Sequence, residues 1–149
     1  MRIRIEASDL PGRICAPGPG FPGYADVHVA VQRRGRADDL LDPQPGDAAR
    51  AVWTLECTTV RTPAGLDVRG SCVQGRPGTR FVYLSWTATR PDGTVGMFRR
   101  AKLMLDAVDT ATVEAALVSG RLVARLGLTD ARGTPLCATV RPPLVTWSA

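Results

Sequence analysis

Arg99, Arg100 and Lys102 are three basic residues in a stretch that otherwise has the apolar sequence of a buried strand. A buried guanidinium or ammonium group requires an acidic partner or an anionic ligand, because removing the charge from water is otherwise costly. Tyr83 and Trp86, on the preceding apolar stretch, would add aromatic surface beside these charges. These five residues are therefore the predicted ligand-binding set, and they favour a small anionic or carbonyl-bearing molecule.

The three basic residues also have a purely structural interpretation. They could pair internally with Glu56, Asp67 or a backbone carbonyl, or extend their stems along the rim of the barrel with their charges in water. Buried charges in proteins are usually paired, which favours this second interpretation. Both interpretations stay open at the level of the sequence.

Groups suited to metal binding or nucleophilic catalysis are sparse. His28 is the only histidine, and no G-x-S-x-G motif surrounds Ser85 to support a triad with His28 and Asp26. The glycines of residues 74–78 precede a predicted strand rather than a helix, so they do not predict a phosphate-binding loop. We therefore expect no metal and no cofactor, and catalytic residues stay unassigned. An enzyme of this kind would be a cofactor-independent cyclase or isomerase that acts through shape and electrostatics.

A β-hairpin at the centre of a sheet is expected to position the five residues. Residues 80–89 are largely apolar on both faces, which is typical of a strand covered on both sides. Arg90-Pro91-Asp92-Gly93 follows as a turn signal, because proline suits the first central position and glycine suits a left-handed residue. Residues 95–105 are predicted to return as the second strand.

The length of the hairpin loop decides which residues share a face. A three-residue loop sets Trp86 opposite Phe98 and Leu84 opposite Arg100, whereas a two-residue Asp92-Gly93 loop shifts the register by one. In the first register, one face holds Trp86, Phe98, Arg100 and Lys102, and the other holds Tyr83, Ser85 and Arg99. Which of the two faces is interior stays open.

The alternation of apolar and polar residues predicts an all-β domain. One short helix is expected near residues 109–119, with Asp109 or Thr110 as its cap and Gly120 as its stop. We expect an antiparallel barrel of about eight strands, or alternatively a two-sheet sandwich, in a single domain over residues 1–149. Pro-rich loops at 11–23 and 35–47 and a short tail at 144–147 complete the chain. The predicted strands are residues 2–7, 24–33, 51–60, 66–74, 80–89, 95–105, 121–129 and 135–141.

Composition and charge narrow the class of protein. The 149 residues are 44% hydrophobic and 22% charged, as in ordinary soluble domains, and no run of about 18 apolar residues predicts a membrane span. The N-terminus lacks a signal sequence, so a cytoplasmic location is expected. The net charge is +5, because 18 arginines and one lysine outnumber 14 acidic residues. The bias toward arginine suggests a GC-rich genome, and the scatter of these charges along the chain does not favour nucleic acid as a partner. Homodimer formation stays open.

The four cysteines, Cys15, Cys57, Cys72 and Cys137, contain no C-x-x-C pair, which disfavours zinc and thioredoxin-like sites. We expect reduced thiols that behave as small buried hydrophobic residues. A disulfide between Cys57 and Cys72 across a hairpin is the alternative.

Four segments of the chain carry a resemblance to known proteins: residues 70–75, 80–86, 98–103 and 128–137. They resemble a family of small bacterial proteins that is frequent in actinobacteria, domain-of-unknown-function family 5990. The resemblance covers nearly the whole chain, from Ile5 to Trp147. It implies membership of that family, and it brings no established activity and no catalytic residue.

Two functions follow from these features. The first is a β-barrel that binds a small anionic or carbonyl-bearing molecule through the five predicted residues. The second is a non-catalytic interaction or accessory module, in which residues 33–36 and 11–23 contact another protein. A binding barrel needs an internal cavity of at least about 300 Å³, and an interaction module does not.

Overall fold

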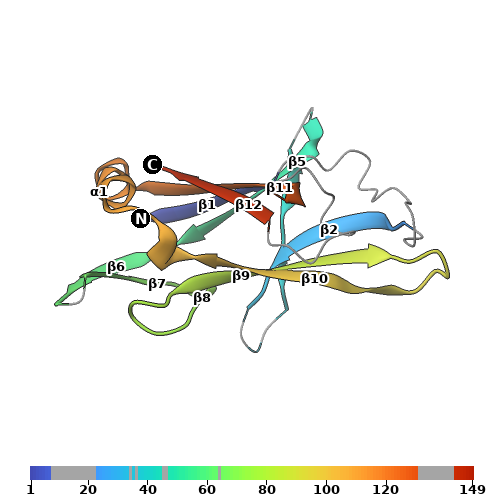
Figure 1. The fold of residues 1–149 in the computed structure, drawn as a ribbon, viewed down its shortest axis with the longest axis horizontal. Coiled ribbons are helices and arrows are strands. Elements are labelled where there is room, and N and C mark those ends of the chain that lie inside the picture. The colour runs from blue at the N-terminus through green and yellow to red at the C-terminus, as the bar shows by residue number, and fades with distance from the viewer. Residues whose placement is uncertain (8–22, 34, 36, 45–46, 64, 131–142) are drawn as a thin grey trace.

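The computed structural model describes residues 1–7, 23–33, 35, 37–44, 47–63, 65–130 and 143–149. These residues are mostly strands, joined by turns and one α-helix, so the predicted predominance of β-structure and the single helix are confirmed. Both termini lie at the end of the molecule where the helix sits (Figure 1).

The first sheet has five strands in the order β12-β11-β1-β5-β4. Its central strand β1 alternates buried Ile3, Ile5 and Ala7 with more exposed charged residues, as its sequence predicts. β1 pairs antiparallel with β5 on one side and parallel with β11 on the other. The strands are β1 (Arg2–Ala7), β4 (Asp42–Gln44), β5 (Asp47–Glu56), β11 (Arg121–Asp130) and β12 (Pro143–Ser148).

The second sheet is antiparallel in the order β10-β9-β2-β3, with the short β8 also paired to β9. A separate two-stranded ribbon, β6 with β7, extends from one end of the molecule (Figure 1). The strands are β2 (Ala25–Val31), β3 (Asp39–Leu40), β6 (Thr58–Thr62), β7 (Gly65–Arg69), β8 (Val73–Gln74), β9 (Phe81–Thr89) and β10 (Val95–Met104).

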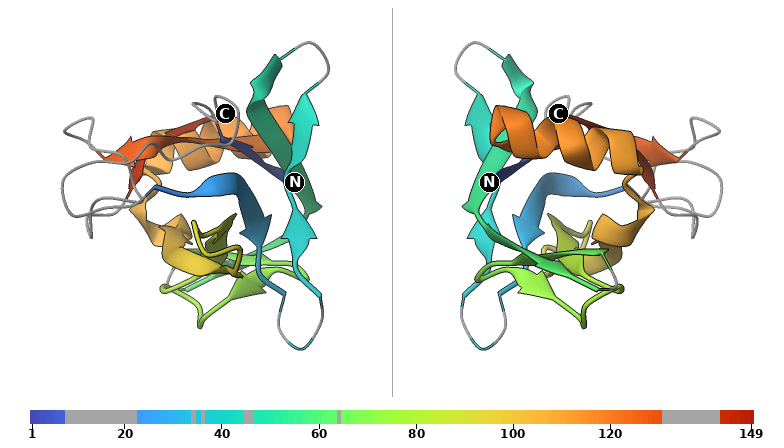
Figure 2. Two further views of the ribbon diagram at one scale, coloured as in Figure 1. Left: turned by 90° about the vertical axis from the view of Figure 1, so that its right-hand side faces the viewer. Right: turned by 90° about the vertical axis from the view of Figure 1, so that its left-hand side faces the viewer.

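One hydrophobic core lies between the two sheets. The first sheet contributes residues such as Ile5 and Trp53, and the second contributes Val29, Leu84 and Trp86. The views along the long axis show the two sheets facing each other, with the helix beside the first sheet (Figure 2). Residues on the inner faces of β9 and β2 are therefore removed from water. On the outer face, the paired residues Ser85 and Ala30 are also buried, whereas the neighbouring Tyr83 and Thr87 are half-buried.

Helix α1 (Thr110–Ser119) forms where the sequence predicts it. The Asp109 carboxylate accepts a hydrogen bond from the Thr112 N–H at 2.9 Å, and the helix ends at Gly120, which has a left-handed φ of 74°. Ala116 is fully buried in the core. The helix follows a 3₁₀ turn at Leu105–Ala107 and leads the chain from the second sheet back to the first.

The predicted antiparallel barrel is not confirmed by this topology. Neither five-stranded sheet closes on itself in the part of the chain that the structure describes. The pairing of β1 with β11 is parallel because α1 returns the chain to the first sheet from the same end at which β1 begins. This pair joins the two ends of the chain, and local alternation of residues carries no information about its direction.

Several segments differ from their predicted form. The tail expected at 144–147 lies in β12, whose first residue, Pro143, is tolerated because β12 is at the edge of the sheet. The loop expected at 35–47 contains β3 and β4, and β4 is also an edge strand. The single strand expected at 51–60 is divided between β5 and β6. The strand expected at 135–141, and the loop at 11–23 except for Gly23, lie outside the described residues.

The hairpin β9–β10 does not sit at the centre of its sheet as expected. β9 is an interior strand, but β10 pairs only with β9 among the described residues. Within those residues, no helix is both long enough and apolar enough to cross a bilayer.

Candidate functional site

The hairpin loop forms as its sequence predicts. The Arg90 N–H donates to the Thr94 carbonyl at 2.8 Å, and the Gly93 N–H donates to the Arg90 carbonyl at 2.9 Å. Gly93 has a φ of 82°, which is the left-handed residue that closes a three-residue loop. The loop places Met97 opposite Thr87, in the predicted register.

A β-bulge at Phe98 then shifts the register by one residue. The shift lies between Met97 and Arg99, so two residues of β10 occupy the space of one on β9. Trp86 therefore lies opposite Arg99, and not opposite Phe98 as expected. Beyond the bulge the pairs are Arg99 with Trp86, Arg100 with Ser85, Ala101 with Leu84, and Lys102 with Tyr83. A one-residue shift moves each side chain to the other face, which corrects the predicted grouping of the site residues.

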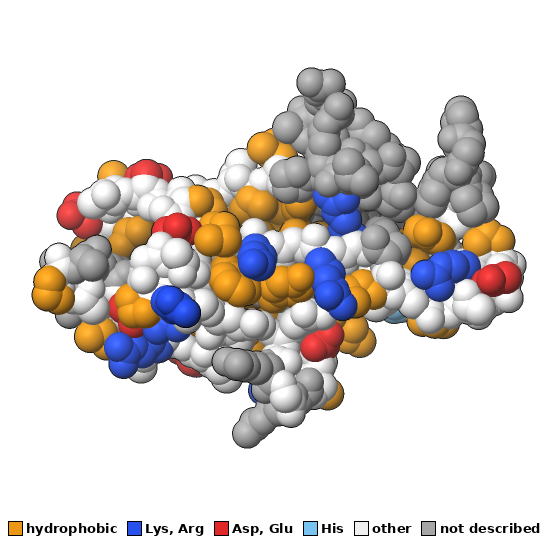
Figure 3. Space-filling view, turned by 60° about the horizontal axis from the view of Figure 1, so that its bottom comes forward, with side chains coloured by type: hydrophobic (Ala, Val, Ile, Leu, Met, Phe, Trp, Pro, Cys, Tyr) orange, Lys and Arg blue, Asp and Glu red, His pale blue; other side chains and the backbone are white. Residues whose placement is uncertain are grey.

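Tyr83, Arg100 and Lys102 lie together on the outer face of the second sheet. The Lys102 Nζ is 4.6 Å from the centroid of the Phe81 ring, and the centroids of Phe81 and Tyr83 are 6.0 Å apart with their planes inclined by 59°. Arg100 and Lys102 are exposed, and the two aromatic rings are half-buried. We call Phe81, Tyr83, Ser85, Arg100 and Lys102 the basic–aromatic face; Figure 3 looks toward this side, where basic side chains lie among hydrophobic ones.

The two cations of this face have no carboxylate partner among the described residues. The Arg100 Nε lies 3.0 Å from the Met97 sulfur, which is only a weak acceptor, and Lys102 contacts the Phe81 ring. A cation above an aromatic ring is held by the negative face of the ring and keeps its other donors in water. With respect to the described residues, both charges are therefore available to an external anion.

Trp86 and Arg99 lie on the opposite, inner face. Trp86 is fully buried, and its Nε1 has no hydrogen-bond partner within the described part of the chain. A buried donor left unpaired costs about 1–3 kcal/mol. Arg99 is half-buried, with its Nε out of contact with water. The predicted five-residue site is thus divided between the two faces of the sheet.

A buried ion-pair cluster centres on Asp67, which was one of the two expected internal partners. Asp67 is 1% exposed, and its carboxylate accepts from the Nε atoms of Arg80 and Arg69, each at 2.8 Å. The hydrogen bond from Arg80, then that from Arg69, lowers the pKa of Asp67 to about 2. The other expected partner, Glu56, pairs with Arg2 on the first sheet at 2.6 Å. The Asp67 cluster ties β7 to the start of β9 and so supports the hairpin.

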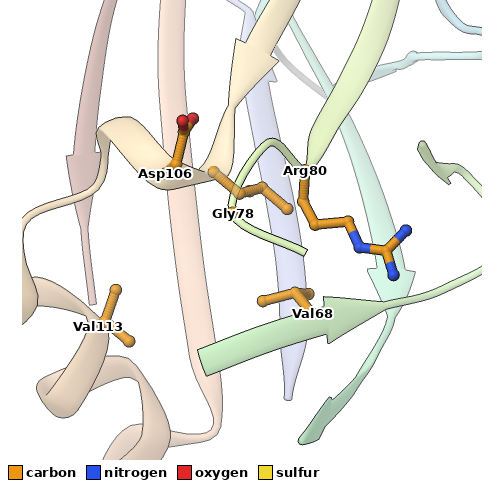
Figure 4. Close-up of a pocket in the computed structure, with 6 residues that line it drawn as sticks. Val68, Gly78, Arg80, Asp106 and Val113 are labelled. Carbon is orange, nitrogen blue, oxygen red and sulfur yellow. The ribbon is translucent and has the colours of Figure 1, made fainter. Parts of the chain in front are cut away.

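A small hollow lies beside this cluster, with a volume of about 60 Å³. Its surface is mainly aliphatic, and the Arg80 guanidinium turns away from Asp106 and Val113 (Figure 4). A site for a small ligand usually has about 300–1,000 Å³, so this hollow accommodates a few water molecules only. It is lined by Val68, Gly78, Arg80, Leu105, Asp106 and Val113.

Residues 33–36 were expected to contact a partner protein, but one of their arginines, Arg33, is held by contacts within the chain. Arg33 forms an ion pair with Asp39, and the Trp53 Nε1 donates to the same carboxylate at 3.1 Å. These contacts, the Arg33 hydrogen bond first, lower the pKa of Asp39. Arg34 and Arg36 lie outside the described residues. Arg33 therefore has a structural role at the end of β2.

Cys57 and Cys72 are buried free thiols, as expected, and no disulfide joins them. Burial raises the pKa of Cys57 to about 11 and also raises that of Cys72. Since the thiolate is the nucleophile, neither sulfur is activated for catalysis. Cys15 and Cys137 lie outside the described residues.

His28 is half-buried on β2, opposite Thr87 of β9. No group of three or more metal-ligating side chains occurs among the residues for which the structure gives positions. Sequence reasoning missed Phe81, which completes the basic–aromatic face. Its alternation with Tyr83 and Ser85 was visible, but its contact with Lys102 depends on the bulge.

Comparison with protein families adds one finding. The model of a family of unknown function, DUF5990, matches residues 1–149. The chain belongs to the DUF5990 family. No curated protein and no solved structure matches this DUF5990 chain. The family carries no assigned activity, so the function of this DUF5990 member is inferred from the geometry of its surface.

Proposed function

We propose that the protein is a non-catalytic interaction module that binds an acidic partner through the basic–aromatic face. The observation that carries this proposal is the position of Arg100 and Lys102. Both project from an exposed sheet face beside Phe81 and Tyr83, and neither has a carboxylate partner in the described residues.

The chemistry of the face suits a protein surface. Arginine and aromatic residues are enriched where protein interfaces are most tightly bound, because they combine apolar area with directional donors. Half-buried Phe81 and Tyr83 supply apolar area that costs little entropy to immobilise, since β9 already holds the rings. The net charge of +5 adds a long-range attraction for an acidic partner.

A small anionic molecule is the second candidate. Lys102 above the Phe81 ring favours it, because a carboxylate could bind the ammonium group while a planar body lies on Tyr83. Small ligands, however, usually bind in cavities that cover most of their surface, and this face is an open sheet. We therefore place the larger acidic partner first.

Two further points belong to the proposal. We infer that the two facing sheets form a sandwich, since one core lies between them. We also infer a cytoplasmic location, which the free thiols of Cys57 and Cys72 support because reducing compartments keep cysteines unpaired.

The test is a binding titration with a fluorescent glutamate-rich peptide, followed by anisotropy. The variant Arg100→Ala/Lys102→Ala is expected to weaken binding by about tenfold or more, since it removes both cations of the face. The matched control is Arg76→Ala/Arg121→Ala, which removes the same charge from exposed positions elsewhere and should have a small effect. Equal losses in the two variants would contradict the proposal. Citrate and benzoate, followed by thermal shift, test the small-molecule candidate.

A further inference from the structure

β10 presents one edge of the second sheet. In the described part of the chain it pairs with β9 alone, and its residues 99–104 form a regular ladder beyond the bulge. An open edge carries backbone N–H and C=O groups that can pair with another strand.

Two hydrogen bonds determine which backbone groups of β9 point toward β10. The Leu105 N–H donates to the Arg80 carbonyl at 2.8 Å, so Arg80 is directed to the side of β10. The Gln32 N–H donates to the Tyr83 carbonyl at 2.8 Å, so Tyr83 is directed to the side of β2. The backbone groups of successive residues in a strand point alternately to the two sides, so Arg80 and Tyr83, three residues apart, should point in opposite directions, as these two bonds show. Ser85, two residues after Tyr83, points to the side of β2 as Tyr83 does.

The open groups of β10 follow from the register. Lys102 lies opposite Tyr83 and Arg100 lies opposite Ser85, which are the residues of β9 that turn away from β10. Lys102 and Arg100 therefore also turn their backbone groups away from β9, toward the edge at which no described strand pairs with β10. The same two residues direct their exposed side chains to the basic–aromatic face. Backbone donors, backbone acceptors and positive charges thus occur at the same two positions.

We propose that the acidic partner binds as an extended strand added to the edge of β10. This inference rests on the proposed function and specifies its mode of recognition, in which main-chain bonds supply affinity and side chains supply specificity. Residues of the added strand that lie opposite Arg100 and Lys102 share their face, with Cβ atoms about 5 Å away. These positions take Asp or Glu. The residue between them lies on the side of Ala101, which is half-buried, and is apolar.

A second copy of this chain fits the edge less well. Antiparallel pairing of β10 with its own copy about Ala101 would set Arg100 of one chain opposite Lys102 of the other. Like charges directly opposite each other destabilise a strand pair, and charged residues on an edge strand are a known protection against self-association. The charges at this edge therefore select an acidic strand with the pattern acid–apolar–acid.

The test compares peptides of equal composition. A peptide of alternating Glu and Val is expected to bind about tenfold more tightly than a block peptide with three Glu followed by three Val. Two N-methylated forms of the alternating peptide are the matched controls, one methylated at every Glu and one at every Val. Only one of these sets of amides faces β10, so one form should lose binding by about tenfold or more and the other should retain it. If the added strand is antiparallel to β10, the peptide methylated at every Glu is the one that loses binding.

The outcomes separate this inference from the proposed function. If the alternating, block and both methylated peptides bind equally, and this binding is still lost in Arg100→Ala/Lys102→Ala, strand addition would be overturned. The proposal that the basic–aromatic face binds an acidic partner would then remain. Binding that is insensitive to Arg100→Ala/Lys102→Ala would overturn both. Hydrogen exchange gives an independent measurement, since the amides of Arg100 and Lys102 should exchange more slowly with the alternating peptide and should be unchanged with the block peptide.

Discussion

At the scale of single residues, charges that are paired inside the protein contribute to stability, and charges without a carboxylate partner are the candidates for function. Asp67 is buried and receives two arginines, so its charge is satisfied inside the protein. Arg100 and Lys102 have no such partner among the described residues. The sequence alone identifies all of these as charges on predicted strands, but it does not show which are paired, because pairing depends on strands brought together by the fold.

The Asp67 cluster leads to a prediction about pH. Its pKa lies at about 2, below the usual 3.8, because its charged form is stabilised by Arg80 and Arg69. The contribution to stability is therefore fully present above pH ~4 and is lost as the pH falls toward about 2. Asp67→Asn should lower the midpoint of urea unfolding at pH 7, and the difference from the unsubstituted protein should shrink below pH ~4.

The control for this prediction is Asp106→Asn, which changes an exposed carboxylate near the same hollow. This substitution should leave the unfolding midpoint nearly unchanged at every pH. A difference between Asp67→Asn and the unsubstituted protein that stays constant from pH 2 to pH 7 would contradict the role given to the ion pairs.

At the scale of elements, turn chemistry and alternation predict most of what is observed. The three-residue loop at Pro91–Gly93 and the helix between Asp109 and Gly120 form as expected, because local residue types determine them. The bulge at Phe98 was not predictable in the same way, since a bulge is a property of two strands together. This one residue moves Arg100 and Lys102 from the face of Trp86 to the face of Tyr83.

The loop that leads into β9 gives a second prediction. Gly75 has a φ of 86°, and a Cβ there would collide with the Thr79 carbonyl oxygen. Gly78, in the same loop, has a φ of 82° and open space around it. Gly78→Ala should cost about 1 kcal/mol of unfolding free energy from the left-handed backbone alone, and Gly75→Ala should cost distinctly more.

Urea unfolding of the two glycine variants measures this difference. Gly75→Ala should also weaken binding of the glutamate-rich peptide, because the Gly75 carbonyl accepts from Arg80 at the start of β9. Equal stability of the two variants would show that the loop adapts freely, and that it does not help to position the hairpin.

At the scale of the whole molecule, two sheets enclose one core and leave a basic, partly aromatic face outward. The all-β class was predictable from alternation, but the separation into two sheets was not. It depends on the pairing of β1 with β11, two strands that are far apart in the sequence. The position of α1 before β11 makes this pairing parallel. The five-residue site was predicted on one hairpin, and the fold retains three of its members on one surface.

The central claim is that Arg100 and Lys102 select a partner by charge, and a reversal of charge tests it most directly. In the variant Arg100→Glu/Lys102→Glu, the face becomes acidic while the inner faces of β9 and β10 stay unchanged. Binding of the alternating Glu-Val peptide should be lost, and an alternating Lys-Val peptide should now bind with an affinity within about tenfold of the original pair. A variant that unfolds at the same temperature as the unsubstituted protein, yet still binds the Glu-Val peptide or fails to bind the Lys-Val peptide, would contradict the account.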